Sequence, residues 1–574
     1  MTTTPTTEPA AEQMAEVDRA IAELARGEAA WAACGLAKRR ELLEGVYAAT
    51  AEQGKAWMRA AVAYKRLPDG SPLIGEEWVS GPYPVLTGTG ALAASVRALE
   101  EGRSPVDAFS TVPAPGGRVA VRVLPHSVWD RLLLSGFSAE VWMPPGVTAE
   151  TVRSRAGLAL RQPAASAGVG VVLGAGNITS IPVLDVLYEL YAHNRVVVLK
   201  LNPVMDGLFE VFSRVLAPLI EVGAVRIVTG GADVGAYVVN HPGVGHVHIT
   251  GSAVSHDAIV FGTGPEGASR KKAGTPLLEK PVTSELGGVS PTIVIPGDWS
   301  EADLRFQAEH VATQRLHNGG YNCVASQVVV VSSDWAQKDR FLAHLRAALA
   351  KAPARPAYYP GSDGRVAQAL ASYPGAERVG GGRVLIDNLD PKEPGPALTT
   401  EYFAPVLGVL ELPGNAGEFL DEAVRTANGK FAGTLGVNLV AHPRTIAALG
   451  PALDEAIAEL RYGTVALNAW TGVGYLTATA SWGAFPGHTL DDVQSGIGVV
   501  HNAVLLDGPE RTVVRGPFRP VPRSVLHGEP AISPKPPWFV TNRTAATTGR
   551  LLTGFAAAPR WSKLPRIFAS ALRG

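Results

Sequence analysis

The sequence is short of cysteine, with two among 574 residues. Two cysteines exclude a disulfide framework, and no Cys/His cluster has the spacing of a zinc site, so we expect no metal. Neither sign of charge dominates, since the formal net charge is −1. This balance excludes the strongly basic footprint of a nucleic-acid-binding protein.

Long apolar runs are also missing. No stretch approaches the ~18 uninterrupted apolar residues that a transmembrane helix needs. The first eight residues lack the basic start and apolar run of a signal peptide. These absences predict a soluble, cytoplasmic protein.

The chain does contain 46% hydrophobic residues, enough at this length for two or three domains with sizeable cores. The first dozen residues are polar and we expect them to be disordered. Helical patterns follow over 15–33, 37–50 and 91–100, with a break at 81–84. From Gly168 onward, short apolar runs alternate with helix-length segments; the runs cover 169–173, 196–201, 225–228 and 246–249.

A second alternating set covers 290–295, 327–331, 383–386, 435–440 and 464–467. Strand–helix alternation at this spacing indicates parallel βαβ units with helices on both faces. We therefore predict an α/β protein with a doubly wound cofactor-binding domain, an α/β catalytic domain and a small oligomerisation element. The predicted limits are 1–137 with 160–287, then 288–490, and finally 138–159 with 491–574.

Polar residues stand where several of these strands end. Asn177 follows the first strand of the first set, where its amide is able to face a developing oxyanion; the alternative is a turn-forming Asn. The segment 174–179 lacks the third glycine of a dinucleotide fingerprint, so we reject that motif. Lys200 ends the next strand, a position that suits ribose hydroxyls or phosphate, or else a solvated lysine.

Two further motifs close the first set. Gly251 and Ser252 follow the fourth strand, either as backbone donors to a pyrophosphate or as an ordinary turn. Glu285 precedes two glycines, and its carboxylate is a candidate general base or an exposed loop residue.

Cys323 lies in the segment N-G-G-Y-N-C-V-A-S-Q (318–327), as a small buried spacer or a reactive nucleophile.

These motifs, together with E-Y-F-A-P-V-L (401–407), occur in the order typical of the aldehyde dehydrogenase superfamily, which the chain resembles over roughly 160–500. The resemblance implies that Cys323 is the nucleophile, that Asn177 and the Cys323 backbone N–H bind the oxyanion, and that Glu285 activates water. It further implies an NAD or NADP cofactor, an aldehyde substrate and a carboxylic acid product. The cofactor contacts that it implies are Lys200, Gly251, Ser252, Glu401 and Phe403.

The sequence departs from the family at several positions. Tyr321 replaces the usual Gln, His256 replaces a glycine, and Pro203 stands where NAD-preferring members often carry Glu. The segment between Ser252 and Glu285 is longer than expected and contains the basic triplet 270–272. We expect these changes to affect cofactor phosphate binding and pocket shape more than the nucleophile.

Two other functions stay open. A CoA-acylating dehydrogenase would resolve the thioester with CoA, although such relatives commonly lack the base at Glu285. A non-catalytic scaffold would retain the fold, although it has no need of Cys323, Asn177 and Glu285 together.

After Glu529 the chain contains no Asp or Glu, and basic residues are interleaved with aromatic ones. We expect this tail to pack on its own chain or on a neighbouring subunit, with a membrane surface as the alternative. With the apolar segment 139–143, we expect the tail to form a homodimer or tetramer contact.

Overall fold

The structure, a computed structural model, describes residues 7–574, with side chains from residue 11 onward. Disorder is expected for the first dozen residues, but residues 7–12 begin helix α1 (Thr7–Ala33), and residues 1–6 lie outside the described part. The next two predicted helices are longer than their patterns, as α2 (Leu36–Tyr64) and α4 (Pro82–Glu100). Proline fits the first turn of a helix, so the Pro-rich segment at 81–84 starts α4 instead of separating it from another element.

The smaller sheet contains the strands of the first predicted set, with β8 and β17 added at one edge. Its order is β17-β8-β7-β4-β5-β6 within residues 7–574, and all neighbours except β17 and β8 run parallel. Its strands are β4 (Val169–Leu173), β5 (Val196–Lys200), β6 (Val225–Val228), β7 (His246–Gly251), β8 (Val282–Leu286) and β17 (Gly496–Ile497). Because the chain runs from β4 to β5 on one side and returns to β7 on the other, the strand order reverses between β4 and β7.

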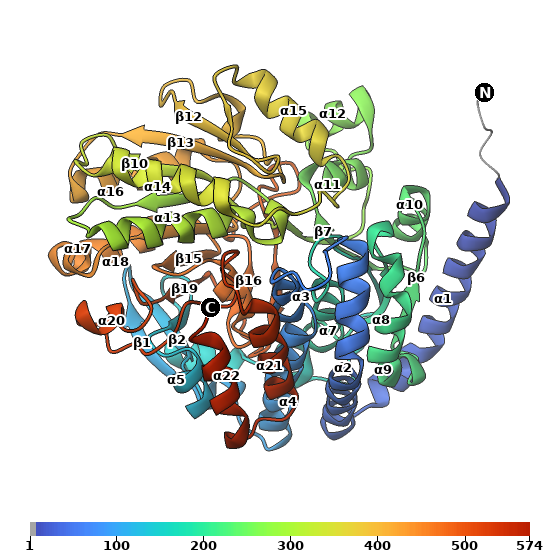
Figure 1. The fold of residues 1–574 in the computed structure, drawn as a ribbon. Coiled ribbons are helices and arrows are strands. Elements are labelled where there is room, and N and C mark those ends of the chain that lie inside the picture. Colours follow the sequence, from blue (N-terminus) through green and yellow to red (C-terminus); the bar gives the residue numbers. More distant parts are fainter. Residues whose placement is uncertain (1–6) are drawn as a thin grey trace.

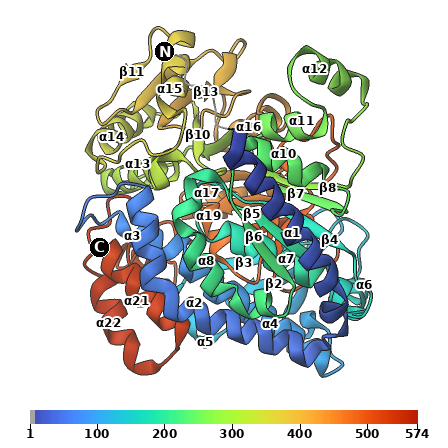
Figure 2. The same cartoon turned by 90° about the vertical axis from the view of Figure 1, so that its right-hand side faces the viewer.

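Helices cover this sheet on both faces, as the alternation predicts. Helix α1 packs against β5, β6 and α10 (Ala232–Asn240), while α7 (Ile181–Ala192) packs against β4 and β5. Figure 2 shows α1 lying across the small sheet from the outside, while α2 runs beside it and packs on α8 (Phe209–Val215). The apolar runs of the strands are buried because parallel strands are covered on both faces.

The larger sheet contains the second strand set. Its order is β1-β2-β3-β19-β15-β14-β9-β10-β13-β12-β11, with a parallel centre and antiparallel edges. Its strands are β1 (Ser110–Ala114), β2 (Arg118–Leu124), β3 (Ser138–Trp142), β9 (Ser290–Val294), β10 (Ser326–Ser332), β11 (Glu377–Arg378), β12 (Val384–Leu389), β13 (Val406–Leu412), β14 (Gly436–Val440), β15 (Thr464–Leu467) and β19 (Arg511–Arg515). Helices α13 (Glu301–Leu316), α14 (Lys338–Lys351) and α16 (Ala416–Lys430) lie with this sheet in the upper part of Figure 1.

The segment expected to contact a second subunit lies inside the molecule. Strand β3 pairs with β2 on one edge and with β19 on the other. Ala139 and Val141 have no exposed surface, and Trp142 is 1% exposed. A strand paired on both edges offers no edge to a partner. The expectation that 139–143 forms a subunit contact is therefore wrong.

The C-terminal tail packs on its own chain. Helix α21 (Ala545–Ala557) contacts α3 (Ile74–Ser80) and α4, and Figure 1 shows it and α22 (Leu564–Ala571) beside these helices. Trp538, Phe539 and Phe555 are buried, whereas Trp561 is 61% exposed. Among residues 7–574, no helix combines the length and apolar character needed to cross a membrane.

Candidate active site

A cavity of about 870 Å³ lies where β4 and β7 are neighbours and the strand order reverses. Open α/β sheets bind ligands at such a point, outside the carboxyl ends of their strands. All eight residues predicted for the site line this cavity: Asn177, Lys200, Gly251, Ser252, Glu285, Cys323, Glu401 and Phe403. The tertiary structure thus joins the ends of β4, β5, β7 and β8 to two loops of the larger sheet.

Cys323 lies in the loop between α13 and β10 and is half-buried. Asn318, Gly319 and Gly320 have left-handed backbone conformations, with φ of 54°, 71° and 84°. A Cβ on Gly320 would lie 3.1 Å from two main-chain carbonyl oxygens, so this tight turn requires glycine. The turn places the thiol at the cavity wall and excludes the reading of Cys323 as a fully buried spacer.

Glu285 lies on β8 and is 2% exposed, so it is not the exposed loop residue of the alternative reading. Burial raises the pKa of its carboxyl to about 7. Trp482 Nε1 donates to Glu285 Oε1 at 3.3 Å. Burial also raises the pKa of the Cys323 thiol, and the nearby charge of Glu285 raises it further. A carboxylate whose pKa lies near neutrality is suited to accept a proton from a thiol or a water.

Asn177 is held in place from both its side chain and its backbone. Its Nδ2 donates to the carbonyl oxygen of Tyr321 at 2.9 Å. Its own carbonyl oxygen accepts from Asn318 Nδ2 at 3.2 Å and from the hydroxyls of Tyr64 and Tyr358, each at 3.3 Å. An Asn amide has two N–H groups, so one fixes the orientation and the second is left for a ligand in the cavity.

A buried ion network holds the loop that carries Cys323. Lys65 Nζ lies 2.8 Å from Glu77 Oε2 and donates to Asn318 Oδ1 at 3.0 Å. Arg355 binds Glu76 and, at 3.1 Å, Glu77. The backbone N–H of Asn318 donates to Glu76 Oε2 at 3.0 Å. Side chains from α2 and α3 thereby fix the loop that carries the cysteine.

The predicted cofactor contacts at the strand ends are placed for an anionic or hydroxyl-rich ligand. Lys200 ends β5 and is 7% exposed, which excludes the solvated reading, and burial lowers its pKa. Gly251 and Ser252 join β7 to helix α11 (Ala253–Val260). Ser252 caps this helix, its Oγ accepting from the Ser255 N–H at 3.1 Å.

Glu401 and Phe403 close the cavity from the larger sheet. Burial raises the pKa of Glu401 to about 8, and its Oε1 is buried without a hydrogen-bond partner among the described residues. A Cβ on Gly287 would collide with this carboxylate, so the glycine leaves room for it. Phe403 has φ of 43°, and its ring lies 4.8 Å from that of Tyr359. A buried, unpartnered carboxylate oxygen fits a ligand hydroxyl that would satisfy it.

The departures from the family pattern have structural explanations. Tyr321 is 2% exposed; its hydroxyl lies 2.7 Å from Ser362 Oγ, and its ring packs on Tyr358. His256 is buried within α11. The basic triplet 270–272 lies in helix α12 (Gly264–Ala273), and Lys271 Nζ lies 2.7 Å from Asp257.

Sequence reasoning missed several residues that touch the site. Trp482 donates to Glu285, and Tyr359 and Arg365 line the cavity. Lys65 and Glu77 act from helices more than 240 positions before the nucleophile. No local pattern marks these residues, because only the tertiary contacts bring them to the site.

Comparison with known proteins finds a family match over part of the chain and a fold match over most of it. Residues 149–363 match the aldehyde dehydrogenase family. The chain is 34% identical over 119 residues to 3,6-anhydro-alpha-L-galactose dehydrogenase of Streptomyces coelicolor, covering 20% of each chain. It is 31% identical over 120 residues to NADP-dependent glyceraldehyde-3-phosphate dehydrogenase of Scenedesmus vacuolatus, covering 21% of this chain and 43% of that one. The chain thus aligns with less than half the length of these curated relatives.

The fold extends the likeness over most of the chain. Gamma-glutamyl-gamma-aminobutyraldehyde dehydrogenase from Burkholderia cenocepacia J2315 superposes with a TM-score of 0.58 at 20% identity, covering 87% of this chain and 88% of that one. An indole-3-acetaldehyde dehydrogenase solved with NAD+ gives 0.58 at 19% identity, covering 88% of each chain. The chain therefore shares the fold of these solved structures. The structural likeness thus shows a shared fold over most of the chain, and the family match lies within it at residues 149–363.

Proposed function

We propose that the protein oxidises an aldehyde to a carboxylic acid, with NAD or NADP as hydride acceptor and Cys323 as nucleophile. The observation that carries this proposal is the placement of Cys323, Glu285 and Asn177 on one cavity, with the Glu285 pKa raised to about 7. In balance, an aldehyde, water and NAD(P)+ become a carboxylic acid, NAD(P)H and one proton. Two electrons leave the aldehyde carbon as hydride.

Residues of this chain prepare the first step. Cys323 gives up its proton to Glu285, and its sulfur forms a bond to the aldehyde carbon, so that the carbonyl oxygen becomes an oxyanion. The second N–H of Asn177 and the backbone N–H of Cys323 stabilise this oxyanion, a contribution of about 3–4 kcal/mol for one such donor. Loss of hydride from the resulting thiohemiacetal leaves a thioester on Cys323.

Glu285 is the base for the second step. After releasing the first proton to solvent, which is the proton of the overall balance, its carboxylate takes a proton from water, whose oxygen forms a bond to the thioester carbon. The carbon–sulfur bond then breaks and the cysteine leaves as thiolate. The same carboxylate serves both steps because it lies beside the thiol and is deprotonated above about pH 7.

The residues of the cavity fit a nicotinamide dinucleotide. Glu401 offers an unpartnered buried oxygen to a ribose hydroxyl, and Lys200 offers an ammonium at the end of β5. Ser252 and the start of α11 offer backbone N–H groups to a pyrophosphate. A bound nicotinamide coenzyme supplies the hydride acceptor. Pro203 lines the cavity without a carboxylate that would repel a 2′-phosphate, so both NAD and NADP belong in the test.

An absorbance screen for NADH and NADPH over a panel of aldehydes, with and without CoA, tests the proposal. We expect coenzyme reduction without CoA and a carboxylic acid as product. Reduction that requires CoA and yields an acyl-CoA would assign the protein to the CoA-acylating dehydrogenases. No reduction with any aldehyde, while Cys323 is reduced and the protein folded, would refute the proposal.

A further inference from the structure

Cys323 also lines a second, smaller cavity, of about 50 Å³, and is the one described residue that lines both. Its walls are mainly apolar and include Val79, Ile178, Trp470 and Leu476. The nucleophile therefore stands between the large cavity and a small apolar pocket. An aldehyde whose carbonyl carbon reaches the sulfur from the small pocket leaves the large cavity free for the coenzyme.

The small pocket has no charged wall. Among the described residues that line it, none is Asp, Glu, Lys or Arg. His317 lines it, and burial lowers the pKa of this histidine, so the ring is neutral at pH 7. Moving a carboxylate or phosphate into such surroundings without a paired cation costs several kcal/mol. The pocket therefore disfavours aldehydes that carry a second charged group.

Two aromatic side chains close the pocket at one end. Tyr475, on α19 (Gly472–Leu476), and Trp482, on β16 (Ser481–Gly483), lie edge to face with ring centroids 5.4 Å apart. The Tyr475 hydroxyl lies 2.6 Å from Ser180 Oγ, which itself donates to the Ser80 carbonyl at 2.7 Å. The hydrogen bond between Tyr475 and Ser180 fixes the tyrosine ring in the wall of the pocket.

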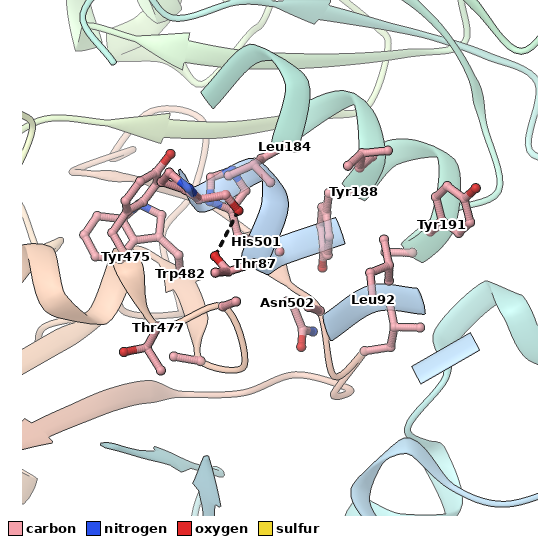
Figure 3. A pocket seen from close by; sticks show the side chains of 18 of the residues that line it. Thr87, Leu92, Leu184, Tyr188, Tyr191, Tyr475, Thr477, Trp482, His501 and Asn502 are labelled. Atoms are coloured by element: carbon pink, nitrogen blue, oxygen red, sulfur yellow. Dashed lines mark hydrogen bonds between the residues drawn. The ribbon is translucent and has the colours of Figure 1, made fainter. Parts of the chain in front are cut away.

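A third cavity, again of about 50 Å³, begins behind the same two rings. Figure 3 shows Tyr475 and Trp482 at one end of it, with Leu92 and Tyr191 at the other. Tyr475 and Trp482 line both cavities and thus form the partition between them. Removing the Tyr475 ring would join the pocket beside Cys323 to this further space.

We propose that the small pocket holds the acyl chain of the substrate, that the substrates are short, uncharged, apolar aldehydes, and that Tyr475 sets the limit on chain length. The inference rests on the proposed function, because it takes Cys323 as the group that bonds the aldehyde carbon. An apolar chain binds more tightly with each methylene it buries until it meets the tyrosine ring, beyond which further methylenes clash or stay outside.

The experiment compares straight-chain aldehydes from acetaldehyde to decanal with succinic semialdehyde, in the parent, Tyr475→Ala and Tyr475→Phe proteins. One readout is kcat/KM. The other needs no coenzyme: reversible thiohemiacetal formation protects Cys323 from iodoacetamide, and mass spectrometry measures the labelling. Cys34 is buried and serves as the internal control for unfolding.

We expect the parent and Tyr475→Phe to prefer short chains over decanal, and butanal over succinic semialdehyde, by about tenfold or more in both readouts. Tyr475→Ala should shift the preference to longer chains. A flat chain-length profile in the parent, equal use of succinic semialdehyde, or a Tyr475→Ala profile identical to that of the parent would overturn the inference. If Tyr475→Ala does not fold, the chain-length profile of the parent and its use of succinic semialdehyde still test the inference.

The two readouts separate this inference from the proposed function. A short-chain, uncharged profile in the protection assay without any coenzyme reduction supports the pocket and refutes the dehydrogenase reaction. Coenzyme reduction that is indifferent to chain length and charge supports the reaction and refutes the pocket.

Discussion

At the scale of single residues, the proposed chemistry depends on the half-buried Cys323 beside the buried Glu285. Replacing Cys323 with Ala removes the nucleophile, and we expect kcat/KM to fall by about 10³-fold or more while coenzyme binding persists. Titration of coenzyme fluorescence checks binding, and Cys34→Ala is the matched control, which should retain activity. Parent-like turnover by Cys323→Ala would exclude covalent catalysis.

The raised pKa of Glu285 predicts in which direction the activity changes with pH. Its pKa is raised to about 7 by burial, and the basic form is the active one, so activity should rise as pH increases through about 7. The Trp482 N–H stabilises the charged carboxylate and lowers that pKa. In Trp482→Phe we therefore expect the acidic limb of the kcat profile to move to higher pH. A limb that stays in place would mean that another group titrates.

The role of Glu285 in the second step has its own test. Glu285→Gln should slow thioester hydrolysis by about 10²-fold or more, since hydrolysis needs an activated water and hydride loss does not. Rapid-quench kinetics at a pH where the thiol still ionises should show a burst of reduced coenzyme followed by slow turnover. An unchanged steady rate with no burst would remove Glu285 from this step.

At the scale of elements, a buried ion pair between Lys65, which follows α2, and Glu77 of α3 holds the loop that carries Cys323. Lys65 and Glu77 have no exposed side-chain surface, so Lys65→Met would leave two buried carboxylates, Glu76 and Glu77, sharing Arg355, and this excess buried charge would cost about 3–5 kcal/mol. The substitution would also remove the donor to Asn318 Oδ1 and loosen the loop. We expect a lower urea midpoint and slower turnover at saturating substrate.

The control for this prediction is Lys38→Met in α2. Lys38 pairs with Glu41 at 2.7 Å, but their side chains are 49% and 67% exposed. Exposed pairs contribute roughly 0–1 kcal/mol, so this variant should resemble the parent protein. Equal midpoints and rates for Lys65→Met and the parent would show that the network does not position the loop.

At the scale of the whole molecule, the tail contributes to the fold of its own chain. A Cβ on Gly75 of α3 would collide with the backbone of Ala545, which shows how closely α3 and α21 approach. Truncation after Glu529 should therefore expose apolar surface of α3 and α4 and lower the thermal midpoint by several degrees. A truncated protein as stable as the parent would contradict this packing role.

Assembly is a separate prediction at this scale. We still expect a homodimer or tetramer, and the exposed Trp561 and Leu572 of the tail, each 61% exposed, are the candidate contacts. The double variant Trp561→Ser/Leu572→Ser should keep the fold and reduce the mass measured by light scattering. An unchanged mass together with lost binding to anionic vesicles would assign these residues to a membrane surface instead.

The sequence by itself predicted the central strands of both sheets, a resemblance to a family, and a set of candidate site residues. Parallel strands that are buried on both faces have continuous apolar sequences. For this reason the sequence alone predicts β4, β5, β6, β7 and β15. The polar residues that follow them meet at one sheet edge because parallel strands share a direction. Motif order then identified Cys323 and Glu285 without knowledge of their surroundings.

Only the tertiary structure decided how those residues behave. A pKa depends on burial and on neighbours from distant elements, so the shift of Glu285 needed Trp482 and the cavity wall in place. The pairing of β3 with β19 and the support of Asn318 by Lys65 join segments hundreds of residues apart. Local patterns record which face of an element is buried, whereas the partner that buries it is fixed only when the chain folds.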